Sequence, residues 1–454
     1  MGRLFGTDGV RGIANGELTC RTAYLLGQAA AVFLGPRIVI GRDTRISGPM
    51  LEAAASAGIM SAGGTVLTAG IIPTPGVALL VRTLQADGGL VISASHNPPE
   101  YNGIKLFDSE GFKLPDAMED RIEAFIAAGG LEEGAAGPEG APSLAAGDGC
   151  GRCQPVQDAL ETYIQHAVDS VLDQGMDLSG LHIALDTGHG ASSLTSPEAF
   201  RRLGARVTVI NDGFDGTDIN VGCGSTHLEP LKELLAASGA DLGIAHDGDA
   251  DRVMAVAPDG RELDGDYMAA TLAIDMKERG RLPGATVVGT VMCNLGFMEA
   301  MARAGIEVVQ TAVGDRYVLE EMRARGFALG GEQSGHMIML DYNSTGDGLM
   351  TACQYLAALK RRPGGIASAA EVMERFPQVL INVKVADKQA VAQNAAVAAA
   401  VDEAERFLGD GGRVLLRPSG TEPLVRVMVE ARTASQAQAA AESIAAVVRS
   451  QLGA

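Results

Sequence analysis

The chain has 454 residues, of which 46% are hydrophobic and 20% are charged, a composition typical of folded globular proteins. This length exceeds what one hydrophobic core supports, so three or four domains are expected. The formal net charge of −20 argues against nucleic acid or an anionic membrane as a partner, because both require clustered Lys and Arg.

The N-terminal residues and the cysteines predict a cytoplasmic protein. Residues 1–6 lack the apolar segment and cleavage site of a secretory signal, and the longest early apolar patch, 23–34, is too short to span a membrane. The six cysteines are scattered, which is not a disulfide framework. Cys150 and Cys153 have the spacing of a metal or redox pair, but no second pair accompanies them, so we assign them no function.

The chain begins with a glycine-rich loop, followed by a first α/β unit. The loop at 5–12 contains Arg11, which could bind a phosphate group or simply pair with Asp8. Three apolar runs follow, and each is predicted to be a buried strand; they lie at 38–40, 64–67 and 90–92.

The third apolar run ends in a loop that contains Ser95 and His96 and is followed by two prolines. Proline lacks the amide hydrogen that a strand needs, so the strand must end there. Ligands of open parallel sheets bind at the carboxyl ends of strands. We therefore predict that Ser95 carries a phosphoryl group. The alternative is a serine that only makes a hydrogen bond within a turn.

The same order of apolar runs returns twice, which predicts a threefold repeat of the α/β unit. The second set lies at 183–185, 205–210 and 241–245, and the third at 286–289, 305–309 and 327–330. The third run of each set ends in a polar loop, at 93–97, 246–252 and 331–336. If the units pack around a cleft, these loops can meet there.

The last part of the chain has a different pattern. A Gly/Ala/Pro-rich stretch at 129–151 separates the first two units, and a second break lies at 361–365. Beyond it we expect a strand, a long helix to about Phe407, two strands joined by a turn, and a final helix. The predicted fold is therefore three similar α/β domains with mixed, mainly parallel sheets plus a C-terminal α+β domain around a central cleft. The predicted domains are 1–152, 153–254, 255–366 and 367–454.

Asp247, Asp249 and Asp251 lie at alternate positions and predict a metal site. Three crowded carboxylates repel one another, and hard oxygen ligands at this density suit Mg²⁺. An EF-hand is excluded, because Arg252 replaces the required glycine and Pro258 the required glutamate. Two alternatives remain: Asp247 is itself the nucleophile, as in aspartyl-phosphate enzymes, or the loop is a solvated acidic turn.

Basic residues near these loops complete the phosphoryl-transfer chemistry. An oxygen of phosphorylated Ser95 could complete the metal coordination, so Ser95 is also a predicted metal ligand. Arg252 is placed to neutralise the same oxygens. Lys105 could act as an acid or base towards a sugar hydroxyl, or be a surface charge.

Two further loops are predicted to bind substrate. Glu332, Ser334 and His336 suit recognition of vicinal sugar hydroxyls, and His336 could also transfer a proton. The turn near residue 420 has the composition of an anion-binding nest that holds a non-reacting phosphate; its residues are Arg417, Ser419, Gly420 and Thr421, with Arg426 beyond the turn.

These four loops, in this order, resemble the α-D-phosphohexomutase family over essentially the full chain. The loops are those of Ser95, Asp247 to Asp251, Glu332 to His336, and Arg417 to Thr421, and residues 5–12 and 313–318 are also similar. The resemblance implies four domains around a cleft, Mg²⁺ and a homodimer. It also implies that Arg11, Lys105 and His336 orient substrate or transfer protons, and that His96 contacts substrate.

The resemblance further implies a mechanism on a hexosamine phosphate. Phosphorylated Ser95 would transfer its phosphoryl group to O1 of glucosamine 6-phosphate. The resulting glucosamine 1,6-bisphosphate would turn over in the cleft and return its 6-phosphoryl group to the serine. Three alternatives remain: the same machinery acting on glucose or mannose phosphates, a phosphatase that uses Asp247, and a non-enzymatic sugar-phosphate-binding protein.

Overall fold

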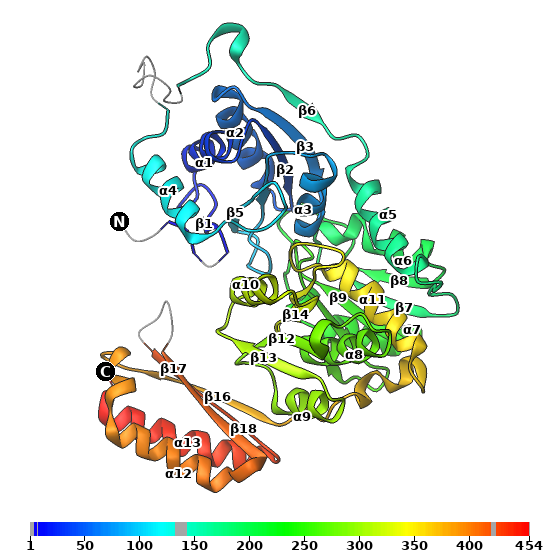
Figure 1. The fold of residues 1–454 in the computed structure, drawn as a ribbon, viewed down its shortest axis with the longest axis vertical. Helices are drawn as coiled ribbons and strands as arrows, with labels where there is room; N and C mark the ends of the chain where they lie inside the picture. Colours follow the sequence, from blue (N-terminus) through cyan, green and yellow to red (C-terminus); the bar gives the residue numbers. More distant parts are fainter. Residues whose placement is uncertain (1–3, 7, 132–142, 419–423, 454) are drawn as a thin grey trace. The chain divides into compact units, whose positions relative to one another are not determined.

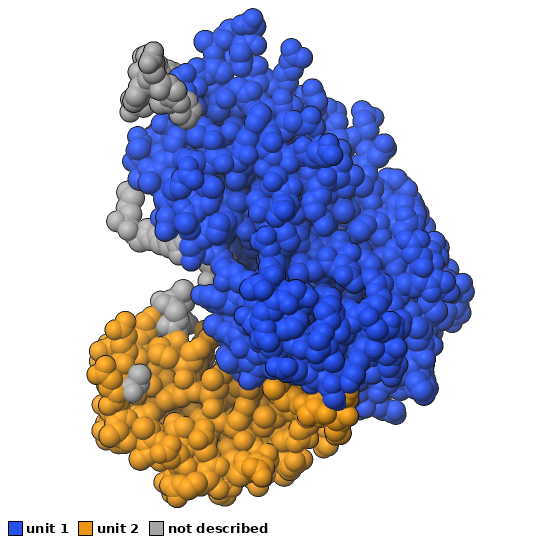
Figure 2. Space-filling model, viewed as in Figure 1, with its two compact units in different colours: residues 1–292, 305–372 blue, residues 293–304, 373–454 orange. Residues whose placement is uncertain are grey.

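The computed structural model describes residues 4–6, 8–131, 143–418 and 424–453. They form two compact units, which Figure 2 colours separately: residues 1–292 with 305–372, and residues 293–304 with 373–454. Within the described residues, no helix has both the length and the apolar character needed to cross a membrane. Cys150 and Cys153 are exposed free thiols.

The first sheet of the larger unit has the strand order β1-β5-β4-β2-β3-β6 (Figure 1). Its strands are β1 (Val10–Ile13), β2 (Arg37–Arg42), β3 (Thr65–Ile71), β4 (Gly88–Ile92), β5 (Tyr101–Phe107) and β6 (Cys153–Pro155). β2 is parallel to β3 and β4, whereas β5 runs antiparallel to β4. Because β6 pairs with β3, the first sheet extends past the boundary predicted at residue 152.

The helices of the first domain are α1 (Cys20–Phe33), α2 (Gly48–Ser61), α3 (Thr74–Thr83) and α4 (Asp116–Ala127). Thr19 caps the N-terminus of α1, because its hydroxyl accepts a hydrogen bond from the Thr22 amide. α1 and α2 approach closely at two glycines. A Cβ at Gly27 would lie 2.1 Å from the carbonyl oxygen of Ala55, so only glycine fits there.

The second sheet has the order β11-β10-β9-β7-β8. Its elements are α5 (Ala159–Leu172), β7 (His182–Asp186), α6 (Ser196–Arg202), β8 (Arg206–Ile210), α7 (Glu229–Ser238), β9 (Leu242–His246), β10 (Val253–Val256) and β11 (Glu262–Leu263). β9 is parallel to β7 and fully buried, and β10 returns antiparallel to it. This sheet extends past the boundary predicted at residue 254.

The third sheet has the order β13-β12-β14-β15. Its elements are α8 (Gly265–Glu278), β12 (Thr286–Thr290), β13 (Glu307–Thr311), α10 (Asp315–Arg325), β14 (Leu329–Gly331), β15 (Met337–Met339) and α11 (Gly348–Arg361). β12 is parallel to β13 and β14, and β15 returns antiparallel to β14.

The three sheets share one topology, which confirms the predicted threefold repeat. In each, the first predicted strand lies between the second and the third, and an antiparallel strand follows the third: β5 after β4, β10 after β9, and β15 after β14. The three polar loops therefore occupy equivalent places, each between the third strand and its antiparallel neighbour.

The smaller unit is the predicted α+β domain. Its elements are α9 (Leu295–Arg303), β16 (Gln378–Lys384), α12 (Ala395–Leu408), β17 (Gly412–Pro418), β18 (Leu424–Ala431) and α13 (Ala434–Leu452), with the antiparallel order β16-β18-β17. α9 lies between β12 and β13 in the chain, within the range predicted for the third α/β domain, and is grouped with this unit by its contacts. Buried Glu430 of β18 explains this, because its carboxylate accepts hydrogen bonds from the Leu295 amide, the Asn294 amide group and Arg413.

Candidate active site

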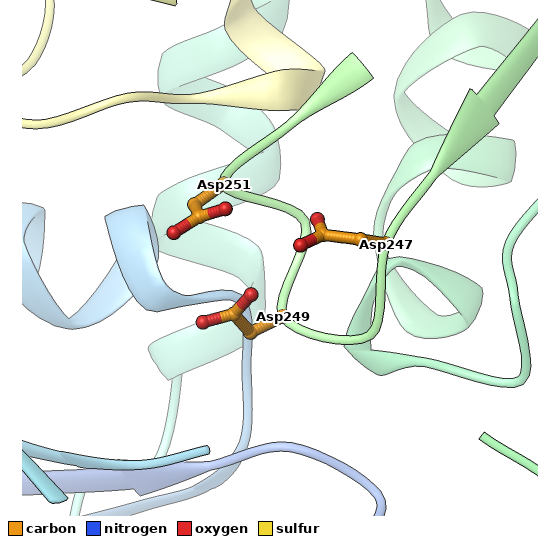
Figure 3. Close-up of side chains that lie close together, drawn as sticks. All are labelled: Asp247, Asp249 and Asp251. Atoms are coloured by element: carbon orange, nitrogen blue, oxygen red, sulfur yellow. The ribbon is translucent and has the colours of Figure 1, made fainter. Parts of the chain in front are cut away.

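The loop after β9 brings three buried carboxylates together. One carboxylate oxygen from each of Asp247, Asp249 and Asp251 lies within 4.8 Å of the others. Ala250 has a φ of 53°, and its amide donates to the Asp247 carbonyl at 3.0 Å, so the chain turns tightly between the acidic residues. Figure 3 shows the three side chains pointing toward a shared space. A solvated acidic turn is therefore wrong, because the carboxylates are buried.

These residues fit a divalent cation. Within the described residues, Oδ1 of Asp249 and Oδ1 of Asp251 are buried and accept no hydrogen bond. A buried carboxylate oxygen without a donor is costly, and a bound cation would remove that cost. Burial, followed by the charges of Asp251 and Asp249, raises the pKa of Asp247 well above its ordinary value. The chemistry of the site thus matches the oxygen ligands that Mg²⁺ prefers.

Ser95 lies next to this acidic cluster. It is fully buried between β4 and β5, and its Oγ donates to Asp247 Oδ2 at 2.6 Å. Its φ of 53° lies in the left-handed region, which a serine rarely adopts. Ser93 Oγ accepts a hydrogen bond from the Ser95 amide at 2.9 Å and donates to Asp43 at 2.6 Å. Equivalent loops of the first two sheets therefore meet at this serine.

Lys105 of β5 contacts the same cluster. Its Nζ lies 2.9 Å from Asp249 Oδ2, 3.3 Å from Asp251 Oδ2 and 3.3 Å from Asp8 Oδ2. Burial alone would lower the pKa of Lys105, but Asp249, Asp8 and Asp251 outweigh it and raise the pKa above its ordinary value. Lys105 is thus a buried cation, and the alternative of a surface charge is wrong.

A cavity of about 390 Å³ opens beside these residues. It is lined by Asp8, Arg11, His96, Lys113, Asp251, Arg252, Val313, Gly314, Asp315, Glu332, Ser334 and His336. The structure thus gathers most of the predicted catalytic and substrate-binding residues of the first three domains around one space. Arg11 pairs with Asp8, and the Arg252 amide donates to Asp247 Oδ1 at 3.2 Å.

The pKa values of the two histidines in the cavity are shifted in opposite directions. Burial, then the charges of Arg252 and Arg11, lowers the pKa of His96 to about 4, so its ring is neutral at pH 7. Burial would also lower the pKa of His336, but Asp251 and Asp315 outweigh it and raise that pKa. His336 Nε2 is buried without a hydrogen-bond partner among the described residues, 3.4 Å from Asp315 Oδ2.

Glu332 also lines the cavity, and a main-chain amide holds its carboxylate. Its Oε1 accepts a hydrogen bond from the Gly314 amide at 3.1 Å, and burial raises its pKa, with His336 opposing this only in part. No ion pair to Glu332 occurs in the described part of the chain. Its other carboxylate oxygen can therefore accept from a ligand in the cavity.

Sequence reasoning missed three lining residues that form one charged chain. Lys113 Nζ lies 2.5 Å from both Asp8 Oδ1 and Asp315 Oδ2. Asp8 and Asp315 lie within motifs used for the resemblance, but only as neighbours of other residues. Lys113 lies on the loop after β5. The residues next to it in the sequence give no indication of its role, because its partners come from distant segments.

The predicted phosphate-binding turn belongs to the smaller unit. Arg417 and Arg426 are direct cross-strand partners on β17 and β18. Ser419, Gly420 and Thr421 lie outside the described residues, so this part of the prediction stays untested.

Four family models match the chain in order. They describe the α/β/α domains I, II and III and the C-terminal domain of phosphoglucomutase/phosphomannomutase, and they match residues 2–133, 161–260, 264–379 and 380–447. Together with the repeated fold and the serine beside the acidic cluster, they define the class: the chain belongs to the phosphoglucomutase/phosphomannomutase family, the α-D-phosphohexomutases.

One curated sequence relative and two solved structures show which proteins this chain is similar to. A phosphoglucosamine mutase of Streptomyces griseus subsp. griseus is 53% identical, with 100% of each chain covered. Among solved structures, a phosphoglucomutase/phosphomannomutase family protein of Burkholderia thailandensis has a TM-score of 0.81 at 22% identity, covering 99% of this chain and 97% of that one. An Aspergillus fumigatus N-acetylphosphoglucosamine mutase, solved with GlcNAc-6P and magnesium, has a TM-score of 0.69 at 18% identity, covering 98% and 95%.

Proposed function

We propose that this enzyme interconverts glucosamine 6-phosphate and glucosamine 1-phosphate through a phosphorylated Ser95 and a glucosamine 1,6-bisphosphate intermediate. The product would supply UDP-N-acetylglucosamine synthesis. One observation carries the proposal: the Ser95 hydroxyl lies 2.6 Å from Asp247, within a buried cluster that suits a divalent cation. The choice of an amino sugar rests on the similarity to phosphoglucosamine mutases such as that of Streptomyces griseus.

Asp247, Asp249 and Asp251, with an oxygen of phosphorylated Ser95, would hold Mg²⁺. When bound, the ion supplies positive charge that stabilises the phosphoryl oxygens during transfer. Lys105 holds Asp249 and Asp251 in place through its two ion pairs.

The remaining residues of the cavity bind and orient the sugar phosphate. Arg252 and Arg11 offer guanidinium groups to phosphoryl oxygens, and Glu332 and Ser334 accept from and donate to sugar hydroxyls. The sugar hydroxyl that attacks must lose a proton as its bond to phosphorus forms. Lys105 and His336 are our candidates for the groups that move protons at the reacting oxygens.

Transfer at both ends of one sugar requires a second binding site for the phosphate that does not react. We assign this role to the turn that contains Arg417, Ser419, Gly420 and Thr421, together with Arg426. The paired positions of the two arginines on neighbouring strands support the assignment, because they concentrate positive charge.

Two measurements test the proposed function. Turnover of glucosamine 6-phosphate should exceed that of glucose 6-phosphate and mannose 6-phosphate, and a strong preference for either of these would overturn the substrate assignment. Mass spectrometry of the resting protein should find phosphate on Ser95. An acid-labile acyl phosphate on Asp247 would instead favour a phosphatase.

A further inference from the structure

The main-chain carbonyl of Ser95 is held by donors from two different domains. Arg45, on the loop after β2, donates through Nη2 at 3.0 Å. Asn220, on a loop of the second domain, donates through Nδ2 at 2.8 Å. The same two groups also donate to the carbonyl oxygen of Asn97, at 2.8 Å and 3.1 Å. We call Arg45 and Asn220 the carbonyl clamp.

The guanidinium of Arg45 donates four of its five N–H groups to the segment 95–101. It is fully buried, and its Nε donates to Asp43 Oδ2 at 2.9 Å. Its other four N–H groups donate to the carbonyl oxygens of Ser95, Asn97, Pro98 and Tyr101. A planar guanidinium has five donors in a fixed arrangement, so this residue fixes where four carbonyl oxygens of the segment 95–101 can lie.

Asn220 brings the second domain into the clamp. Its φ of 61° is left-handed, a conformation that asparagine tolerates better than most residues. Two further hydrogen bonds join the Arg45 loop to the second domain: the Ile46 amide donates to the Gly216 carbonyl at 2.9 Å, and Thr44 Oγ1 donates to the His189 carbonyl at 2.6 Å.

The clamp fixes a conformation that Ser95 would not adopt alone. A left-handed serine is strained and persists only where surrounding contacts determine it. In this conformation the carbonyl faces the clamp while the hydroxyl faces Asp247. The direction of the side chain is therefore set by bonds to the main chain on the opposite side of the residue.

We propose that Arg45 and Asn220 are positioning residues that align phosphorylated Ser95 with the accepting hydroxyl of the sugar. The inference rests on the proposed function. In the aligned step, a new bond forms between the sugar oxygen and phosphorus, the bond between phosphorus and Ser95 Oγ breaks, and the hydroxyl proton ends on Oγ. Water can replace the sugar, giving inorganic phosphate and free serine.

The two acceptors depend differently on alignment. The sugar oxygen is held by the cavity and reacts only if the phosphoryl group points at it, and small misplacements cost roughly 100-fold in rate. Water is not held and can approach from many directions. Loosening the loop should therefore reduce transfer to the sugar much more than hydrolysis, so that the ratio of transfer to hydrolysis falls.

The sharpest test is Asn220→Gly, because glycine adopts the left-handed conformation readily and lacks the side chain that donates to the serine loop. The matched control is Asn211→Gly: Asn211 also has a left-handed φ, of 55°, but its amide donates to Asp186 Oδ1 at 3.0 Å instead of to the serine loop. Each protein is phosphorylated with glucose 1,6-bisphosphate. Transfer to glucosamine 6-phosphate, release of inorganic phosphate, KM and the melting temperature are then measured.

For Asn220→Gly we expect transfer to fall about 10- to 100-fold with little change in KM, and phosphate release per transfer to rise by a similar factor. Asn211→Gly should lose stability without changing this ratio. Arg45→Lys keeps the charge beside Asp43 but loses the fork, and it should shift the ratio in the same direction if it folds.

The outcomes separate the two proposals. If the wild-type protein neither carries phosphate on Ser95 nor turns over hexosamine phosphate, the proposed function fails. If the wild type is active but Asn220→Gly keeps the wild-type ratio, or the control shifts it equally, the clamp is overturned.

Discussion

Thr74 offers a direct way to test whether the acidic cluster is held in shape by its neighbours. It is the first residue of α3, is fully buried, and contacts the metal loop twice. Its Oγ1 donates to Asp249 Oδ2 at 2.6 Å, and its amide donates to the Asp249 carbonyl at 2.9 Å. The positive end of the α3 dipole therefore also faces Asp249.

Thr74→Val keeps the shape of the side chain and removes only the hydroxyl. A hydrogen bond to a charged group contributes roughly 1.5–3 kcal/mol, so the free energy of unfolding should fall by about that amount without added metal. Groups that orient a metal ligand typically change affinity by about 10- to 100-fold, so the affinity for Mg²⁺ or Mn²⁺ should fall within that range. The amide hydrogen bond remains, which keeps α3 in place.

Thr83→Val is the matched control, since Thr83 lies at the other end of α3 and, among the described residues, its Oγ1 donates only to the Leu79 carbonyl, at 2.9 Å. We would measure urea unfolding over a series of Mg²⁺ concentrations and Mn²⁺ binding by calorimetry. The control should stay within about 0.5 kcal/mol of the wild type. Equal stability losses in the two variants, with unchanged Mn²⁺ affinity, would refute the view that Thr74 orients Asp249.

Three further predictions follow from other parts of the molecule. Lys105→Met removes the cation shared by buried Asp249 and Asp251 and by partly exposed Asp8, so without divalent metal the free energy of unfolding should fall by roughly 3–5 kcal/mol, and unfolding curves with Mg²⁺ should recover part of this. Ser95→Ala should show no covalent phosphate by mass spectrometry and no turnover, although it should still bind hexosamine phosphate. Burial raises the pKa of Asp347. Its carboxyl group therefore stabilises the fold most below its unfolded pKa of about 3.9, and the stability advantage of the wild type over Asp347→Asn should shrink as the pH rises through the folded pKa. Urea midpoints that differ by the same amount at every pH would contradict this.

The fold was predictable wherever the sequence carried a strong apolar signal. The runs 38–40 and 242–245 lie in buried strands because a strand covered on both faces must be apolar along its length. β6 was missed because Cys153–Pro155 is polar and exposed, and only its pairing with β3 makes it a strand. The grouping of α9 with the smaller unit was not predictable, because an amphipathic pattern does not reveal which neighbour covers its apolar face.

The site was predictable where chemistry depends on residues close together in the chain. The alternate positions of Asp247, Asp249 and Asp251 predict a metal site, with Asp247 as a nucleophile the alternative, and the fold brings the three carboxylates together. By contrast, Lys113 and Arg45 are ordinary basic residues until folding brings distant carboxylates or carbonyls to them. Their roles lie in tertiary contacts, which no local pattern encodes.

The charges around the cavity explain why the cluster, the basic residues and the serine have to act together. The chain is acidic overall, and even the cavity lining holds more carboxylates than guanidinium and ammonium groups, with Asp247 and Asp249 adding to the excess behind it. A phosphorylated sugar would be repelled by such a site unless positive charge were supplied there. Lys105, fixed between the carboxylates, offsets only part of the excess. We therefore expect a divalent cation at the cluster to favour binding of the sugar phosphate as well as transfer, so that binding of the substrate and of the metal should be interdependent.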